Sequence, residues 1–162
     1  MKAIVCADIN DCIGKDNQLL VHISEDLKRF RELTDHHEVV MGRKTYDSLP
    51  TNLPNRICHI LSRTVSNNDC SHHFFHSSLG WLMRCIDQEN AFVIGGAQIY
   101  ELLLPYCDTV YMTRVLDNFT GDAFFPTLYH TDWDCETSEI KTDGTYQFRY
   151  ETYRRRPKDN EC

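Results

Sequence analysis

Hydrophobic residues recur along this chain in two alternating patterns. Short runs rich in β-branched residues predict strands at 3–7, 38–42, 56–62, 73–76, 91–95 and 109–115. Between these runs, apolar residues recur at helical spacing and predict helices at 24–34, 43–49, 78–88 and 97–104. Strands that alternate with helices in this way indicate a mostly parallel sheet covered by helices.

The end of the chain has a different pattern. Residues 133–141 and 145–155 flank Asp143-Gly144, a dipeptide typical of tight turns. The second run alternates strictly and places four side chains on one face: Tyr146, Phe148, Tyr150 and Thr152. We therefore expect an α/β fold with a central mixed, mostly parallel sheet of about eight strands, a C-terminal antiparallel hairpin and about four flanking helices.

Length and composition indicate one globular domain. The chain has 162 residues, of which 41% are hydrophobic and 25% charged, and we expect a single domain over 1–156 with a polar tail at 157–162. The Asn- and Ser-rich stretch 62–73 is expected to form a surface loop. No apolar run approaches the roughly 18 residues of a membrane span, and Asp8 interrupts the N-terminal apolar stretch before a signal peptide is complete.

Charge and cysteine usage narrow the function classes. The formal net charge of −7 argues against nucleic acid as a partner, so any anionic ligand must be held by local cations. The eight cysteines show no CxxC spacing, which favours a reduced cytoplasmic protein over a disulfide scaffold. The pairs His36-His37 and His72-His73 lack HExxH spacing, and we interpret them as loop histidines without a metal.

One acidic residue falls on the apolar face of the first predicted helix. Helical spacing from residue 24 places Asp26 between Phe30 and Leu33. A carboxylate there must be desolvated, which raises its pKa and suits it to hold a proton or to bind paired N–H donors of a flat heterocycle. Thr113 could offer it a hydroxyl. The alternative is an acid that only complements the helix dipole, and the residues alone leave both interpretations open.

Two segments combine a buried strand, glycine and a helix start. Gly42 precedes Arg43-Lys44-Thr45, and Gly95-Gly96 precedes Ala97. Helix N-termini present free N–H groups, and glycine lets a phosphate approach the backbone. Each segment alone is a common packing device, but together with Arg63 they suggest a ligand with several phosphates, such as a dinucleotide with an additional 2′-phosphate. By itself, Arg56 is interpreted as an exposed arginine at a strand start.

Seven stretches, in this order and spacing, resemble dihydrofolate reductases across nearly the whole chain. They are IGKDNQL (13–19), EDLKRFRELT (25–34), VVMGRKTYDSLP (39–50), LPNR (53–56), FVIGGAQIYELLLP (92–105), TRV (113–115) and GDAFFP (121–126). The resemblance implies a monomeric enzyme that reduces 7,8-dihydrofolate to 5,6,7,8-tetrahydrofolate with NADPH, supports one-carbon metabolism and thymidylate synthesis, and binds antifolates.

The resemblance also implies roles on the substrate side. Asp26 would bind the amino group and N3 of the pterin and favour protonation of N5, with Thr113 as its partner and Leu19 as a third catalytic position. Arg56 would hold the α-carboxylate of the substrate. The implied substrate pocket comprises Ile4, Val5, Cys6, Leu27, Phe30, Arg31, Leu49, Leu53, Ile94 and Tyr100.

On the cofactor side, the resemblance implies a nicotinamide near Cys6 and Ile13, a pyrophosphate on the two helix starts, and a 2′-phosphate beside Arg43, Ser62 and Arg63. Residues 14–19 would belong to a mobile loop that closes over the site. The complete implied NADPH set is Cys6, Ile13, Gly14, Asn17, Gly42, Arg43, Lys44, Thr45, Leu61, Ser62, Arg63, Gly95, Gly96, Ala97, Gln98 and Ile99.

The chain departs from the family pattern at three places. Leu20-Val21 stands where most members have Pro-Trp, Ser24 where a proline is common, and Ala123 where threonine usually follows Gly-Asp. The missing indole normally helps to order water near the pterin. Two alternatives therefore stay open: a catalytically impaired nucleotide-binding structural or regulatory protein of the same fold, and a reductase for a related heterocycle, as in riboflavin synthesis. Arg56 argues against the second alternative, because only a substrate with a glutamate-like tail would bind this arginine.

Overall fold

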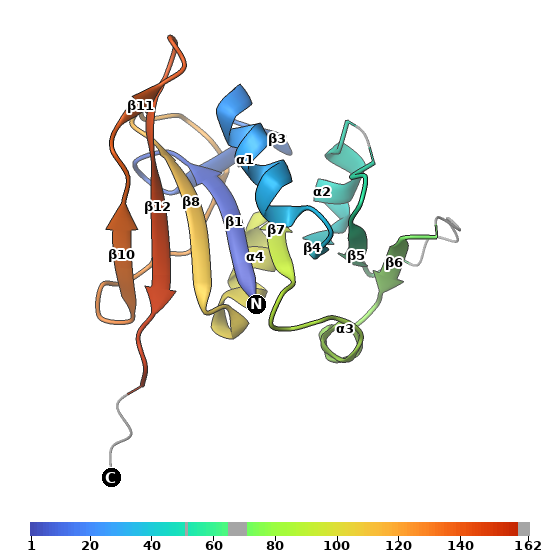
Figure 1. Ribbon diagram of the computed structural model, residues 1–162. Helices are drawn as coiled ribbons and strands as arrows, with labels where there is room; N and C mark the ends of the chain where they lie inside the picture. The colour runs from blue at the N-terminus through green and yellow to red at the C-terminus, as the bar shows by residue number, and fades with distance from the viewer. Residues whose placement is uncertain (51, 65–70, 159–162) are drawn as a thin grey trace.

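The computed structural model of the protein describes residues 1–50, 52–64 and 71–158. The predicted loop at 62–73 and tail at 157–162 therefore lie partly outside the described residues. The main path of the central sheet contains β1 (Lys2–Ala7), β4 (Glu38–Gly42), β5 (Ile57–Leu61), β6 (His73–His76), β7 (Phe92–Gly95), β8 (Thr109–Val115), β10 (Trp133–Thr137) and β12 (Gln147–Arg155). They lie side by side in the order β10-β12-β8-β1-β7-β4-β5-β6 (Figure 1).

The sheet is mixed, as the alternation of strands and helices predicted. The neighbours from β8 through β1, β7, β4 and β5 to β6 are all parallel. Only β12 runs against them, since it pairs antiparallel with β8, with β10 and with the short β11 (Lys141–Thr142). The C-terminal hairpin around Asp143-Gly144 is therefore confirmed, and it adds the antiparallel edge to a parallel sheet.

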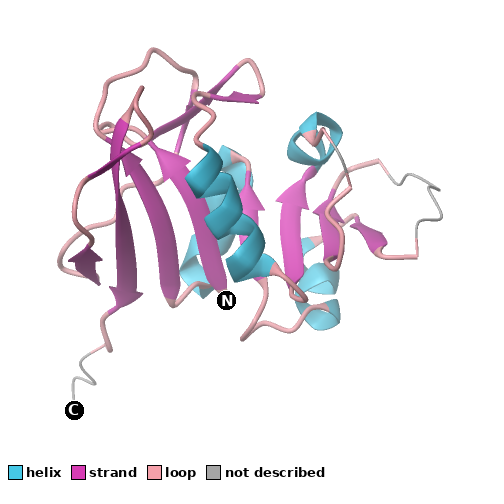
Figure 2. Ribbon diagram, turned by 45° about the horizontal axis from the view of Figure 1, so that its top comes forward, coloured by secondary structure: helices cyan, strands magenta, loops and turns pink. Residues whose placement is uncertain are grey.

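Four helices cover the two faces of this sheet: α1 (Ser24–Thr34), α2 (Arg43–Ser48), α3 (Leu79–Cys85) and α4 (Ala97–Leu103). A 3-10 turn, Leu104–Tyr106, follows α4. Figure 1 and Figure 2 show α1 in front of the sheet and α4 behind it. The alternation along β1 explains both faces, because Val5 packs with the α3 and α4 side chains whereas Ile4 packs with Phe30 and Leu33 of α1. Among the described residues, no helix is long and apolar enough to cross a membrane.

A second, small sheet was not predicted. It joins β3 (Gln18–Leu19), β2 (Cys12–Lys15) and β9 (Ala123–Phe124). Asp16 and Asn17 have positive φ values of 51° and 62°, the backbone that a tight hairpin turn requires. The stretch expected as a loop is thus a hairpin, and it is paired with a strand from far along the sequence.

The third predicted helix is shorter than expected. Instead of spanning 78–88, α3 ends at Cys85, because Ile86 is extended with φ −96° and ψ 153°. The Asp87 carbonyl then accepts hydrogen bonds from the amides of Asn90 and Ala91 in a turn.

Two buried histidines face each other across β5 and β6. His59 Nδ1 lies 2.9 Å from His76 Nε2, and each residue is only 4% exposed. The other ring nitrogens, His59 Nε2 and His76 Nδ1, have no hydrogen-bond partner within the described chain. Only one proton fits between the two rings, so the two histidines cannot both be charged in this arrangement. Burial and then the charge of His76 lower the pKa of His59 to about 4, and burial also lowers that of His76.

This pair predicts acid-sensitive stability. Between the folded pKa of about 4 and an unfolded pKa near 6.5, the unfolded chain binds more protons, so the stabilisation is complete above the unfolded value and is lost as the pH falls toward the folded one. We expect the double variant His59→Leu/His76→Leu to remove about 2 kcal/mol from the fall in unfolding free energy between about pH 7.5 and pH 4.5. Urea denaturation across this range measures it, with the exposed His72→Gln as control. Identical pH slopes in the double variant and the wild type would contradict this expectation.

Candidate functional site

The two glycine turns of the predicted phosphate site meet at one edge of the sheet. The strands β4 and β7 are parallel, with Met41 opposite Gly95, so their carboxyl ends lie together. A Cβ added at Gly42 would lie 2.9 Å from Ile99 Cγ1 of α4, and one at Gly96 would lie 3.4 Å from Thr45 Oγ1 of α2. The starts of α2 and α4 are therefore in contact and can serve one ligand.

These helix starts suit phosphate groups. Gly42 and Gly96 are the N-caps of α2 and α4, and in the described chain neither helix has a side-chain cap. The N–H groups of the first turns are therefore presented to the edge, where they favour an anion. Gly95 has φ +124°, and a Cβ there would lie 3.4 Å from the ring of Tyr100, so this position requires glycine.

Cations predicted for the phosphate site lie at the same edge. Arg43 opens α2 and its Nε donates to Asp47 at 3.0 Å, while its guanidinium lies over the ring of Phe75. Lys44 and Arg63 are exposed. Gly42 is opposite Leu61 in the β4–β5 register, which brings the residues after both strands together. This donor set fits a dinucleotide with an extra phosphate.

Asp26 lies on the inward side of α1, where the sequence placed it. Its carboxylate accepts a hydrogen bond from the hydroxyl of Thr113, a residue of β8 that is 2% exposed. Burial raises the pKa of Asp26, and the hydrogen bond from Thr113, the charge of Arg29 and the Cys6 thiol oppose that rise. A carboxylate that is desolvated and yet anchored can bind N–H donors in pairs and influence a proton nearby.

The inner wall beside Asp26 is uncharged. Burial first, and the neighbouring Asp26 second, raise the pKa of the Cys6 thiol, and Cys6 is opposite Thr113 in the β1–β8 register. Burial also raises the pKa of Tyr100, whose hydroxyl donates to the Ile4 carbonyl at 2.6 Å. Both groups therefore stay protonated, and the charge on this wall comes from the carboxylate.

Two hollows adjoin the predicted site. A cleft of about 230 Å³ is lined by Tyr46, Asp47, Leu49, Asn52, Leu53, Cys58 and His73. A smaller cavity is lined by Cys6, Ala7, Asp8, Ile13, Leu19, Leu20, Val21, Val115 and Phe119. The larger cleft lies beside α2, and two predicted substrate residues, Leu49 and Leu53, line it, whereas Asp26 does not. The smaller cavity brings together three predicted residues, Cys6, Ile13 and Leu19, although Leu19 is 67% exposed.

The interpretation of Arg56 as an exposed arginine is wrong. Arg56 is 4% exposed, because its guanidinium donates to the carbonyls of Pro54 at 2.6 Å and Arg31 at 2.7 Å. It also donates to the Thr34 hydroxyl at 3.1 Å, and Asp35 lies 3.9 Å away. The arginine is thus held rigidly at the C-terminal end of α1. The Arg31 side chain, in contrast, is exposed.

The remaining predicted substrate residues are divided between the two faces of the sheet. Val5 and Tyr100 belong to the core under α3 and α4, and Leu27 is partly buried on α1. The residues that pack together on the α1 side are Ile4, Phe30, Leu49, Leu53 and Ile94. On the cofactor side, Ser62 is buried and its hydroxyl donates to the Thr64 carbonyl at 2.8 Å, whereas Asn17 and Gln98 are exposed. These assignments to ligands stay predictions.

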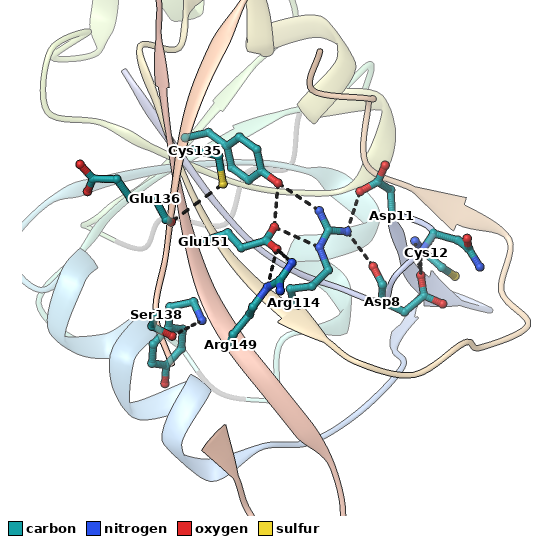
Figure 3. A network of polar contacts seen from close by, with 12 residues as sticks. Asp8, Asp11, Cys12, Arg114, Cys135, Glu136, Ser138, Arg149 and Glu151 are labelled. Atoms are coloured by element: carbon teal, nitrogen blue, oxygen red, sulfur yellow. Dashed lines mark hydrogen bonds and ion pairs between the residues drawn. The ribbon is translucent and has the colours of Figure 1, made fainter. Parts of the chain in front are cut away.

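Sequence reasoning missed the ion network that supports the site. Figure 3 shows Arg114 between the turn after β1 and the buried Glu151 of β12. Arg114 Nη1 donates at 2.7 Å to both the Asp8 carbonyl and the Asp11 carboxylate, and its Nε donates to Glu151 at 3.1 Å. Burial opposes ionisation of Glu151, but hydrogen bonding from Tyr153 and the charge of Arg114 outweigh it and keep its pKa below the ordinary value.

Asp8 completes this support. Its carboxylate, in a residue 1% exposed, accepts hydrogen bonds from the amides of Asn10 at 2.8 Å, Cys12 at 2.9 Å and Phe119 at 2.8 Å. The turn that leads to Ile13 is therefore fixed from both sides. Long-range pairs of this kind leave no local pattern, and the only sequence signal is a carboxylate within a run of strand residues.

The structure gives no sign of a metal centre in its described part. No group of three or more His, Cys, Asp or Glu side chains there could hold a metal ion, and the six described cysteines are free thiols. His36 lies in a turn after α1. His73, expected in a loop, instead begins β6, and its Nδ1 lies 3.0 Å from the Tyr46 hydroxyl.

Comparison with known proteins identifies similar chains. The family model that matches residues 1–155 is described as dihydrofolate reductase. The dihydrofolate reductase of Bacillus subtilis (strain 168) is 39% identical over 150 residues, covering 91% of this chain and 89% of that protein. The dihydrofolate reductase of Staphylococcus haemolyticus is 34% identical over 155 residues, covering 94% and 93%.

A solved structure is similar over the same length. It is the dihydrofolate reductase from Enterococcus faecalis complexed with NADP(H) and RAB-propyl, with a TM-score of 0.82 and 31% identity. The match covers 96% of each chain.

The Arg114 network predicts a large loss of stability on truncation. Arg114→Met would remove the arginine that pairs with Asp11 and one of the two arginines that pair with the buried Glu151, the other being Arg149 at 2.8 Å. We expect the free energy of unfolding to fall by about 3 kcal/mol in chemical denaturation. The matched control is Arg154→Met, which removes an exposed pair with Glu136 at 3.3 Å and should cost under about 1 kcal/mol. Equal losses in the two variants would show that the buried network contributes nothing special.

Proposed function

This chain belongs to the dihydrofolate reductase family and is an NADPH-dependent oxidoreductase, and we propose that the carboxyl edge of its sheet, around Asp26, is where 7,8-dihydrofolate is reduced to 5,6,7,8-tetrahydrofolate. The observation that carries the proposal is the buried Asp26 carboxylate, anchored by Thr113 next to two glycine turns that suit phosphates. A packing role requires neither a desolvated acid nor uncapped helix starts at one edge.

The chain's own residues bind and orient the reacting rings. Asp26 accepts N–H donors from the 2-amino group and N3 of the pterin, and its negative charge favours a proton at N5. Thr113 keeps the carboxylate in place, and the uncharged wall of Cys6 and Tyr100 excludes water. In this proposal Arg56, which is held by the carbonyls of Pro54 and Arg31, binds the α-carboxylate of the substrate.

NADPH supplies the hydride when it is bound. The starts of α2 and α4, beginning at Arg43 and Ala97, would hold its pyrophosphate, and Arg43, Ser62 and Arg63 would hold the 2′-phosphate. Cys6 and Ile13, which lie close to Leu19, would contact the nicotinamide. Residues placed in this way would orient the two rings for hydride transfer, which is the main contribution that a protein makes to such a reaction.

The proposal extends to the state in which the enzyme acts. We place it in the cytoplasm as a monomer with one domain over 1–156, which binds antifolates in the pterin site and does not bind nucleic acid. Free thiols at the six described cysteines and a net charge of −7 support the cytoplasmic and nucleic-acid parts of this proposal.

A spectrophotometric assay tests the proposed function. Mixing the purified protein with NADPH and 7,8-dihydrofolate should consume the near-ultraviolet absorbance of the cofactor, and the consumption should stop with a pteridine antifolate. Binding of NADPH without any turnover above background would instead favour the non-catalytic alternative.

Asp26→Asn tests the role of the carboxylate. The amide is nearly the same size but cannot carry the charge, so we expect hydride transfer near neutral pH to fall by at least about 100-fold. NADPH affinity should stay nearly unchanged, since the phosphates lie at the helix starts. Fluorescence titration with NADPH and single-turnover kinetics measure the two effects. A parallel loss of both would indicate that Asp26 is a structural acid.

Arg56→Lys tests the recognition of the substrate tail. Lysine keeps the charge but loses the planar fork, so we expect KM for dihydrofolate to rise about tenfold with little change in kcat. A dihydropterin without the glutamate tail serves as the control substrate, and its kcat/KM should not change. Because Arg56 also holds Thr34 and Arg31, the melting temperature is measured alongside. Equal losses for both substrates would exclude a role in tail binding.

A further inference from the structure

Arg29 lies one helical turn after Asp26 and is fixed by two aromatic rings. Its guanidinium carbon is 3.9 Å from the ring centroid of Tyr150 and 5.8 Å from that of Tyr111. Contacts of this kind hold a cation in place without neutralising it. The side chain is partly buried and belongs to α1, the helix that carries Asp26.

The strand register brings this cation toward the Asp26 site. Tyr150 of β12 is opposite Thr113 of β8, so their side chains share one face of the sheet. Tyr111 lies two residues before Thr113 on the same strand and points to the same face. Arg29 therefore stacks on the two rings next to the residue that anchors Asp26.

The charge of Arg29 acts on Asp26 through space. Within the described chain Arg29 makes no ion pair with Asp26, yet its charge lowers the pKa of that carboxyl against the effect of burial. Burial lowers the pKa of Arg29 itself, while Tyr150, Asp26 and Tyr111 act in the opposite direction. A guanidinium stays charged throughout the physiological range, so the site always feels this cation.

The other groups around Asp26 are neutral or paired. Cys6 of β1, Tyr100 of α4 and Thr113 of β8 lie near it as uncharged groups. On the outer side, burial and then Glu25 raise the pKa of Tyr150 to about 12, so this phenol is also neutral. Glu25 pairs with Lys141 at 3.4 Å, and Lys141 lies 5.9 Å from the Tyr150 ring. Arg29 is therefore the charged group best placed to influence the carboxylate.

We propose that Arg29 is a positioning residue that keeps Asp26 ionised, sets the pH range of hydride transfer, and selects against ligands that enter the pterin site as cations. The inference rests on the proposed function. Its physical basis is that a fixed positive charge opposes a second one nearby, whether a proton adds to Asp26, to N5 of the substrate or to a basic inhibitor. The charge of Arg29 therefore disfavours all three events: protonation of Asp26, protonation of N5 and binding of a cationic inhibitor.

The pH profile of the full-length enzyme tests the first part. Arg29→Gln removes the charge, so protonated states near Asp26 become more favourable, and the pH at which hydride transfer falls to half should rise by about 0.5 to 1 unit. Arg29→Lys keeps the charge and should remain near the wild type. Lys28→Gln is the matched control, because Lys28 is exposed on the same helix, pairs with Glu32 and should leave the profile unchanged.

Inhibitor binding tests the second part without turnover. Trimethoprim, a basic diaminopyrimidine, is the cationic probe, and it should bind Arg29→Gln about three- to tenfold more tightly than the wild type near neutral pH. Folate, whose ring is neutral, should bind both within about twofold. Misfolding does not produce a selective gain in affinity, so this outcome separates the charge effect from structural damage.

The outcomes are distinct from a failure of the proposed function. If the wild type consumes no NADPH with dihydrofolate, the proposed function fails, and the trimethoprim titration still decides the role of Arg29. An unshifted pH profile in an active Arg29→Gln enzyme overturns the inference, as does unchanged or weaker trimethoprim binding. A shift of the same size in Arg29→Lys also overturns it, because stacking and not charge would then be responsible.

Discussion

The desolvated carboxylate of Asp26 is the constraint on which the site depends. An acid on the inward face of a helix is unfavourable unless other groups hold it, and here a buried hydroxyl of Thr113 does so. That bond requires α1 to lie across the sheet next to β8, and it requires β1 and β8 to be paired so that Cys6 and Thr113 are opposite. The contacts that position Asp26 for chemistry are therefore also contacts that pack α1 against the sheet.

The second part of the site, the pair of glycine turns, depends on the parallel direction of the strands. Because β4, β5 and β7 all end at one edge, the glycine turns at Gly42 and Gly96 meet there, close enough that Cβ atoms would contact Ile99 and Thr45. The strand beside β7 is β1, whose carboxyl end leads to Asp8 and the smaller cavity. The sheet thus defines the distance between the two glycine turns and the acid.

Residue patterns along the sequence predicted the features that depend on neighbouring residues in the chain. The strands, the four helices, the Asp143-Gly144 hairpin and the inward position of Asp26 all follow from spacing along the chain. The sheet of β2, β3 and β9 was missed because strands of two to four residues form only when a partner from residues 123–124 pairs with them.

Burial of Arg56 was missed for a related reason. Its partners are the carbonyls of Pro54 and Arg31 and the hydroxyl of Thr34, and two of these lie more than twenty residues away in sequence. Residue type suggested solvent, but the end of α1 offers acceptors that no composition rule reveals. His59 and His76 were missed in the same way, since the two rings meet only after β5 and β6 pair.

Two partly buried arginines near the site, Arg114 and Arg29, have different partners, and this difference decides their roles. Arg114 is surrounded by acceptors, since the Asp8 carbonyl, Asp11 and Glu151 all bind it, so its charge is neutralised where it lies and its effect is structural. Arg29 is held by aromatic faces, which fix a cation but leave its field uncompensated. A charge that is fixed and unneutralised acts on the nearest titratable group, and on the inner side of α1 that group is Asp26. The partners of an arginine, more than its burial, therefore determine whether it stabilises the fold or adjusts the chemistry.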